Sequence, residues 1–389
     1  MNTNLTQMAT FLTLPSGITL HYDGAGAGEP LILIHALGTD LRLWDALAPL
    51  LTTFCTVKRY DLRGHGLSSA PPAPYSLRDH VDDLRGLLDH TGVEKATLCG
   101  VSVGGLIAMQ FALDHPQRVA RLVLCDTDAR IGSAALWENR IKLVRERGLD
   151  TISPDILARW FAPNYREKNP AAWEGWRTLL ARQNAEGYSG TCVALRDADI
   201  RDQVGNITIP TQVIVGEQDV SVTVDAARTL AAALPNAEMR VIDDCGHLPP
   251  IEQPESLFAA IRDFMREGDA YERGMAIRRS VLGDTHVDRA EANKTAFDSD
   301  FQHFITEMAW GNVWSRGGID RPTRHMLTLA VLAALGREPE LAMHLRATRN
   351  TGVTLEQLRE VFFQVAIYAG VPAANSAFSL AKRELTDHD

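Results

Sequence analysis

The chain has 389 residues, more than one ordinary hydrophobic core needs, and this length fits two domains. Hydrophobic residues make up 45% and charged residues 23%, as in globular proteins, and no run approaches the ~20 apolar residues that span a bilayer, so we expect no membrane partner. A formal net charge of −10, with no cluster of Lys and Arg, argues against nucleic acid as a partner.

The first ten residues lack the basic start, apolar run and small-residue cleavage site of a secretory signal. The five cysteines are odd in number and include no C-x-x-C pair. We therefore expect a cytoplasmic protein with reduced cysteines. Without a Walker loop, a dinucleotide fingerprint or His/Cys ligand spacing, we expect neither a cofactor nor a metal.

From Leu31 onward, short apolar runs alternate with helical patterns. The runs predict strands at 31–35, 56–60, 96–99, 119–125, 211–215 and 238–243, and the patterns between them predict helices near 44–51 and at 77–91, 105–113, 222–233 and 254–266. Such alternation indicates crossover connections and a parallel sheet. Residues 131–204 interrupt it with a helical, Trp-rich segment, which we interpret as an inserted cap.

The pattern changes after residue 267. The polar stretch 268–279 lacks core periodicity and is the predicted linker. Beyond it only helical patterns occur, and their start and stop signals include Pro322, Pro339, Gly352 and the capping-box pair Thr354 and Gln357. The sequence thus predicts an α/β domain over 1–267 and a smaller all-α domain over 280–389.

A G-x-S-x-G pentapeptide, Gly100-Val101-Ser102-Val103-Gly104, lies between a predicted strand and a predicted helix. In that context the small residues permit a sharp turn that exposes the serine hydroxyl above the sheet. Ser102 is therefore the predicted nucleophile.

A serine needs a base and an orienting acid. His247, in Gly246-His247-Leu248-Pro249 before the last helix of the α/β domain, is the predicted base. Asp219 follows the strand at 211–215 and gives the order Ser, Asp, His; Asp126 and Asp128, after the strand at 119–125, are the alternative position for the acid.

Attack by Ser102 creates an oxyanion that needs two N–H donors. We expect one from Val103, the residue after the nucleophile. The other is expected from Leu37, in the turn His35-Ala36-Leu37-Gly38.

These motifs, together with Trp44 and Asp61-Leu62-Arg63-Gly64-His65-Gly66-Leu67-Ser68, resemble the 3-oxoadipate enol-lactonases of the α/β-hydrolase superfamily. The resemblance covers roughly residues 10–267 and implies the α/β-hydrolase fold with a helical cap. Other small esterases, lactonases and cofactor-free perhydrolases share the triad and stay open as alternatives. An enol-lactone of this kind carries a free carboxylate, for which Arg130, Trp137 and Arg196 are the candidate partners.

The C-terminal part resembles the carboxymuconolactone decarboxylase family. The residues that carry the resemblance are Arg316-Gly317-Gly318-Ile319-Asp320, Arg324, Leu327-Thr328-Leu329, His344, Gly352-Val353-Thr354, Glu356, Leu358, Glu360 and Tyr368-Ala369-Gly370-Val371-Pro372-Ala373-Ala374. Peroxidase chemistry, which occurs in the same helical family, needs a C-x-x-C pair. No cysteine follows Cys245, so the decarboxylase branch is favoured.

Decarboxylation of such a lactone needs donors for a developing oxyanion and a proton for carbon. His344 is the first candidate for the acid, and Glu340, one helical turn earlier, could orient its ring. Arg324 could bind a substrate carboxylate. His303, His325 and Trp310 are further candidates.

The two resemblances fit one pathway, the protocatechuate branch of the β-ketoadipate pathway. Decarboxylation of 4-carboxymuconolactone gives 3-oxoadipate enol-lactone, and its hydrolysis gives 3-oxoadipate. We therefore expect a bifunctional enzyme that acts on carboxylated lactones, and the second family implies a homo-oligomer built through the helical domain. The alternative is a single-function serine esterase or lactonase whose helical domain serves only oligomerisation.

Overall fold

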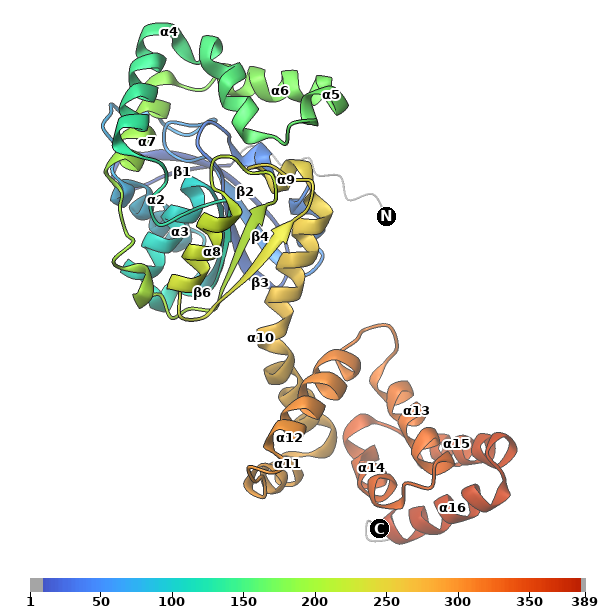
Figure 1. Ribbon diagram of the computed structural model, residues 1–389. Helices are drawn as coiled ribbons and strands as arrows, with labels where there is room; N and C mark the ends of the chain where they lie inside the picture. The colour runs from blue at the N-terminus through green and yellow to red at the C-terminus, as the bar shows by residue number, and fades with distance from the viewer. Residues whose placement is uncertain (1–9, 386–389) are drawn as a thin grey trace. The chain divides into compact units, whose positions relative to one another are not determined.

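The computed structural model describes residues 10–385, with the side chains of residues 266–269 excepted. Two compact units divide the chain between Asp263 and Phe264 (Figure 1). The stretch 268–279, predicted from the sequence as a linker, is helical and belongs to α10 (Pro254–Leu282). In the described part of the chain no helix is long and apolar enough to cross a membrane.

The first unit is built on an eight-stranded sheet with the order β1-β2-β4-β3-β5-β6-β7-β8. β2 pairs antiparallel with β1 and with β4, and all other neighbours are parallel. The mostly parallel sheet expected from the sequence is confirmed. The strands are β1 (Thr10–Thr13), β2 (Thr19–Gly26), β3 (Glu29–Ile34), β4 (Cys55–Tyr60), β5 (Ala96–Val101), β6 (Val119–Cys125), β7 (Thr211–Gly216) and β8 (Ala237–Ile242).

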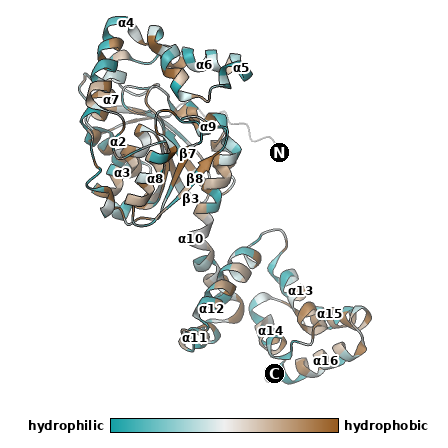
Figure 2. Ribbon diagram, viewed as in Figure 1, coloured by the Kyte–Doolittle hydropathy of each residue, from teal (hydrophilic) through white to brown (hydrophobic). Residues whose placement is uncertain are grey.

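The central strands are apolar on both faces because helices cover the sheet. β5 and β7 are buried along their whole length, and Figure 2 shows β7 among the most hydrophobic segments of the unit. The helices that connect these strands are α2 (Leu77–His90), α3 (Val103–Asp114) and α8 (Val224–Ala233). The hairpin β1–β2 precedes the region where the sequence alternates clearly, and the sequence did not predict it.

A helical cap is inserted between β6 and β7, where the sequence predicted one at 131–204. Figure 1 shows its helices in green, gathered at one end of the sheet. They are α4 (Ala134–Trp160), α5 (Tyr165–Lys168), α6 (Pro170–Ala181) and α7 (Ala185–Asp197).

The second unit is helical throughout its described residues, as expected. After α10 come α11 (Asp284–Ala292), α12 (Ser299–Ile305), a π-helical segment η4 (Thr306–Trp314), α13 (Arg321–Ala334), α14 (Glu338–Thr351), α15 (Leu355–Tyr368) and α16 (Val371–Leu385). The sequence did not predict the π-helical turns. The hydrophobic core is formed by α13 to α16 around Leu329, Leu345, Phe362 and Ala377.

Local signals fix the ends of these helices. The Asp320 side chain accepts a hydrogen bond from the Thr323 amide at the start of α13. α14 ends at Gly352, whose φ of 79° lies in the left-handed region that a residue with a Cβ rarely adopts. Thr354 and Gln357 form the expected reciprocal capping box at the start of α15.

Candidate active sites

Ser102 lies in a strained turn between β5 and α3. Its φ of 55° and ψ of −119° are unusual for a residue other than glycine. The flanking glycines leave the required space: a Cβ on Gly104 would lie 2.2 Å from the Ile34 carbonyl oxygen, and one on Gly100 would lie 2.3 Å from the Gly104 backbone. The motif thus fixes the serine through backbone geometry.

His247 and Asp219 meet in the loops that follow β8 and β7. His247 Nδ1 and Asp219 Oδ2 are 2.7 Å apart, and both side chains are buried. The Ser221 amide donates to Asp219 Oδ1 at 2.6 Å, which holds the carboxylate in place. Because Nδ1 of His247 is bound to Asp219, Nε2 is the ring nitrogen that can exchange a proton.

The loop that carries His247 is tied to the cap by Glu252 of α9 (Pro249–Glu252). The two oxygens of this carboxyl accept separately from the amides of Gly246 and Ala162, each at 2.9 Å. Burial raises the pKa of Glu252 to about 7. The carboxyl therefore bridges the loop and the residue that follows the α4 C-cap.

Asp126, the alternative acid of the sequence analysis, also reaches this site. One oxygen or nitrogen of each of Asp126, Asp219 and His247 lies within 4.8 Å of the others, and all three residues are buried. Asp126 Oδ1 accepts from the Gly216 amide at 2.8 Å. Burial, and then the charge of Asp219, raise the pKa of Asp126 well above its ordinary value. The cluster therefore disfavours ionisation of Asp126, and the hydrogen bond of His247 is made to Asp219. Asp128 is only half-buried and is not part of this group.

The two expected oxyanion donors lie on neighbouring turns. Val103 is the first residue of α3, and Leu37 lines the same pocket as Ser102 and His247. Neither backbone amide hydrogen bonds to another described residue. His35 shapes the Leu37 turn, because its Nδ1 lies 2.8 Å from the Ala36 carbonyl oxygen and its Nε2 accepts from the Leu62 amide.

The pocket of Ser102 has a volume of about 80 Å³, and its cations differ from those expected. Arg140 and Arg159 of α4 line it, and neither forms an ion pair with a described carboxylate. The expected Arg130 and Arg196 do not line it; they pair with Asp199 and Asp197. Trp137 does line the pocket, but its indole N–H donates to the Ile131 carbonyl at 2.6 Å and is not available to a substrate. The sequence could not make this choice because it depends on which side chains of the folded cap face Ser102.

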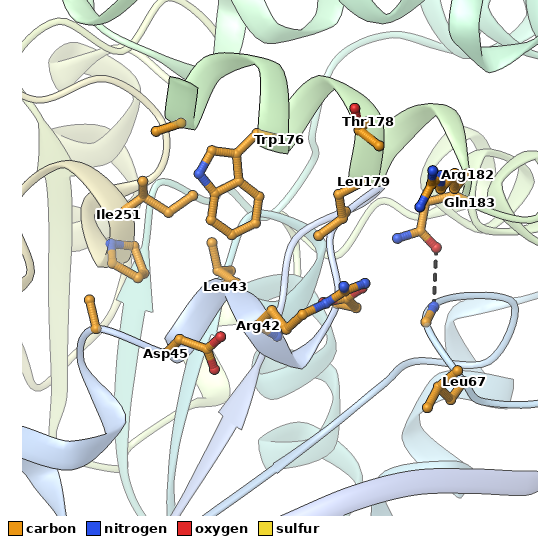
Figure 3. A pocket seen from close by; sticks show the side chains of 16 residues that line it. Arg42, Leu43, Asp45, Leu67, Trp176, Thr178, Leu179, Arg182, Gln183 and Ile251 are labelled. Carbon is orange, nitrogen blue, oxygen red and sulfur yellow. Dashed lines mark hydrogen bonds and ion pairs between the residues drawn. The ribbon is translucent and has the colours of Figure 1, made fainter. Parts of the chain in front are cut away.

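A larger cavity of about 500 Å³ lies elsewhere in the first unit and contains neither Ser102 nor His247. In Figure 3, Trp176 and Leu179 of α6 point toward Leu43 of η1 (Leu41–Trp44) and Ile251. Cavity size alone therefore does not identify the reactive site. The chemistry-bearing side chains gather in the smaller pocket.

In the helical unit the candidate acid His344 is buried and hydrogen bonded. Its Nδ1 lies 3.1 Å from Nε2 of His325, on α13. His325 Nδ1 lies 2.6 Å from the Thr351 hydroxyl. The pKa values of both histidines are lowered to about 4, mainly by burial. Two neutral imidazoles therefore form the polar centre of this unit at neutral pH.

Aromatic rings flank this pair. Trp310 and Trp314 of η4 stack on His344, with ring centroids 6.3 and 6.2 Å away. Two of the further candidates, His325 and Trp310, are thus brought to His344. The third, His303, is not, since it stacks on Tyr271. The π-helical turns bring both indoles to the histidine.

In the helical unit the role expected of Glu340 is corrected, whereas that of Arg324 stays a prediction. Glu340 is exposed, and no hydrogen bond or ion pair joins it to His344 among the described residues; His325 holds His344 Nδ1 instead. Arg324 is half-buried, and its guanidinium donates to the Arg316 carbonyl at 2.7 Å. Sequence reasoning missed the buried Arg278 of α10, which binds the Thr306 hydroxyl at 3.0 Å and has an Nε without a partner among the described groups.

Comparison with known proteins agrees with this division. A family model described as alpha/beta hydrolase fold matches residues 29–254, and the carboxymuconolactone decarboxylase family matches residues 299–383. The 3-oxoadipate enol-lactonase 2 of Acinetobacter baylyi is 36% identical over 251 residues, which are 64% of this chain and 94% of that protein. The 4-carboxymuconolactone decarboxylase of the same organism is 48% identical over 123 residues, 32% of this chain and 92% of that protein. The crystal structure of an enol-lactonase from Burkholderia xenovorans superposes with a TM-score of 0.65 at 34% identity, over 66% of this chain and 100% of that one.

The chain belongs to the α/β-hydrolase family, and its C-terminal part belongs to the carboxymuconolactone decarboxylase family. It is a fusion of a region similar to 3-oxoadipate enol-lactonases with a region similar to 4-carboxymuconolactone decarboxylases.

Proposed function

We propose that the chain is a bifunctional enzyme of the β-ketoadipate pathway. Its helical unit decarboxylates 4-carboxymuconolactone to 3-oxoadipate enol-lactone, and its first unit hydrolyses that enol-lactone to 3-oxoadipate. The observation that carries the proposal is the fusion itself. One relative is named as a 4-carboxymuconolactone decarboxylase, and decarboxylation of that lactone gives 3-oxoadipate enol-lactone, the substrate in the name of the other relative.

Hydrolysis in the first unit starts with attack of Ser102 on the lactone carbonyl while His247 Nε2 takes the hydroxyl proton. The short contact between His247 Nδ1 and Asp219 supports this assignment, because it fixes the tautomer and stabilises the imidazolium. The amides of Leu37 and Val103 bind the oxyanion. Ring opening leaves an acyl-enzyme whose own chain carries the enolate. The proton held by His247 neutralises this enolate, which becomes the ketone, and water activated by the neutral His247 then cleaves the acyl-enzyme.

Arg140 and Arg159 are the proposed partners of the substrate carboxylate. Both line the pocket of Ser102. Arg140 also donates to the Tyr188 hydroxyl at 3.0 Å, which orients its guanidinium. An arginine fork binds a carboxylate through two hydrogen bonds, and such a contact would place the lactone ring relative to Ser102.

Decarboxylation in the helical unit needs no cofactor in principle. When CO2 leaves, the electron pair enters the conjugated lactone, and the ring carbon then needs a proton. We assign that proton to His344, whose Nε2 has no hydrogen-bond partner among the described residues. Arg278 and Arg324 are candidate partners for the substrate carboxylates.

The test uses the full chain with Ser102→Ala. The variant is given freshly generated 4-carboxymuconolactone, and CO2 release and lactone products are followed by NMR. We expect CO2 to appear at the native rate and enol-lactone to accumulate, because only the second step is blocked.

Two other results would contradict the proposal. If no CO2 appears while unmutated protein opens authentic enol-lactone, the helical unit loses its assigned activity and the chain is a single-function lactonase. If the variant still opens enol-lactone at the native rate, Ser102 is not the nucleophile.

We also propose that the helical unit binds a second copy of this chain. Apolar side chains at helical spacing are exposed on two of its helices, Leu327, Val331 and Leu335 on α13 and Phe363 and Ile367 on α15; Ile367 is 78% exposed. Monomeric proteins rarely leave such stripes in water.

The cytoplasmic location expected from the sequence stays a prediction that cell fractionation would test.

Sedimentation velocity of the full chain tests this assembly. We expect a multiple of the 42.8 kDa chain mass, and a shift toward one chain in Ile367→Glu. A matched control is Val241→Glu, at an exposed apolar position of β8 in the first unit, which should leave the mass unchanged. A single-chain mass for the native protein would contradict the proposal.

A further inference from the structure

Three side chains in the helical unit form a continuous hydrogen-bonded chain that ends at His344. His344 Nδ1 and His325 Nε2 are 3.1 Å apart, and His325 Nδ1 and the Thr351 hydroxyl are 2.6 Å apart. His325 comes from α13, and His344 and Thr351 come from α14. All three are buried, and His325 is 0% exposed, so solvent does not compete for these contacts.

The direction of the hydrogen bonds follows from Thr351. Its hydroxyl donates to the Thr348 carbonyl oxygen at 3.1 Å. A hydroxyl has one proton; with that proton on the Thr348 carbonyl oxygen, the hydroxyl accepts from His325, and we assign the hydrogen of His325 to Nδ1 on this basis. A neutral imidazole has one N–H, so His325 Nε2 accepts, and His344 Nδ1 is the donor. The lone pair of neutral His344 is therefore on Nε2.

That nitrogen has the access a reacting group needs. No described group hydrogen bonds to His344 Nε2, and this atom is not one of the fully enclosed polar atoms without a partner. Trp310 and Trp314, whose ring centroids are 4.9 Å apart, lie on one side of the His344 ring, and neither contributes a charge. His286 of α11 is the titratable group whose positive charge would act on His344. The nearest nitrogens of His325 and His344 are 3.1 Å apart. Because two imidazolium rings at this distance repel each other, the pair takes one proton at a time.

We propose that His325 is a positioning residue, which directs the one exchangeable proton of the histidine pair to Nε2 of His344, where it faces the substrate. The inference rests on the proposed decarboxylase function. When His344 is protonated, its Nδ1–H stays bound to His325, so the Nε2–H is the proton that can leave. A bound substrate with two carboxylates adds negative charge beside the pair and favours this protonated form.

The reaction balances with one proton per turnover. The substrate carboxylate leaves as CO2, and its bonding electron pair moves into the conjugated lactone carbonyl. The proton on His344 Nε2 moves to the ring carbon, and enol-lactone forms. Neutral His344 then regains a proton from water, so each CO2 released consumes one proton.

The test compares two substitutions at the same position in the full chain. In His325→Gln the side-chain oxygen reaches the place of Nε2 and can still accept from His344 Nδ1. In His325→Asn the shorter amide reaches only the place of Nδ1, so it keeps the Thr351 contact and loses His344. We expect His325→Asn to lower kcat for CO2 release by about tenfold or more with KM little changed, and His325→Gln to retain most of the activity.

A spectroscopic measurement tests the tautomer directly. In protein labelled with ¹⁵N-histidine, the His344 signals are identified by their loss in His344→Gln. We expect a protonated Nδ1 and an unprotonated Nε2 in the native protein, and a mixture of tautomers in His325→Asn. Enol-lactone hydrolysis by the same samples serves as the internal control, since the first unit is untouched.

The outcomes separate this inference from the function on which it rests. Native protein with His344 protonated at Nε2 in its neutral form would overturn the inference, whether or not the variants fold. Equal CO2 release by the Asn and Gln variants would overturn it as well. If His344→Gln releases CO2 at the native rate, it is the assignment of His344 as the acid that fails.

Discussion

The two units position their reactive groups by different physical means. In the first unit the backbone does so: Ser102 is held in a strained turn at a strand end, and Asp219 and His247 follow two other strands. In the helical unit side chains do so: His344 is hydrogen bonded to His325 from another helix and is flanked on one side by two indoles from a π-helical segment. A site fixed by backbone geometry leaves a local sequence motif, whereas one fixed by side-chain packing does not.

The sharpest test of the backbone-fixed site compares its two acids. Asp219→Asn should lower kcat for enol-lactone hydrolysis by roughly 10⁴-fold, because an amide cannot stabilise the imidazolium or fix its tautomer. Asp126→Asn should cost less than about tenfold, or about 1.4 kcal/mol, because burial raises the pKa of Asp126 and favours its neutral form, and the amide that replaces it still accepts from Gly216. Steady-state hydrolysis rates decide, and a greater loss in Asp126→Asn would move the acid role to that residue.

The role of the backbone is tested at Gly104. In Gly104→Ala the new Cβ would lie 2.2 Å from the Ile34 carbonyl oxygen, so we expect a loss of about 3 kcal/mol in the unfolding free energy and a strong loss of hydrolysis. The matched control is Gly175→Ala in α6, where no atom lies within 4 Å and the helix should gain up to about 1 kcal/mol. Denaturant unfolding measures both. Equal stability of the two variants would show that the turn tolerates a side chain.

The pocket cations offer a test of substrate specificity. Arg140→Leu should raise KM for the carboxylated enol-lactone by roughly 10- to 100-fold, since a charged hydrogen bond contributes about 1.5–3 kcal/mol. It should leave hydrolysis of a neutral ester nearly unchanged. Arg196→Leu is the control, because Arg196 pairs with Asp197 and does not line the pocket. If Arg196→Leu has the larger effect on KM, the substrate carboxylate binds elsewhere.

The smallest expected effect concerns Glu252. Its pKa is raised to about 7 in the folded protein, so the folded state holds a proton that the unfolded state has lost. The associated stability is present below about pH 4.5 and is lost as pH rises through 7. The Tm of native protein should therefore fall relative to that of Glu252→Gln between these values. Calorimetric scans at several pH values measure it, and a constant Tm difference would contradict the raised pKa.

The sequence by itself determined the order of the strands and helices from Leu31 onward, the helical second unit and the local signals at helix ends. These features depend on short-range periodicity and on capping chemistry. The sequence did not predict the hairpin β1–β2, because its second strand contains two glycines and is only partly buried. The sequence did not predict the continuous helix α10, because the residues that its 268–279 stretch buries at helical spacing are Ala270, Gly274 and Arg278, which are not large apolar residues.

The sequence also determined the candidates Ser102, Asp219 and His247, because their order and their places after strands are local properties. Only the tertiary structure brought Asp126 to the same cluster, selected Arg140 and Arg159 over Arg130 and Arg196, and paired His344 with His325 instead of Glu340. These choices depend on which helix faces meet. One sequence does not encode that choice locally, since facing side chains come from segments far apart in the chain.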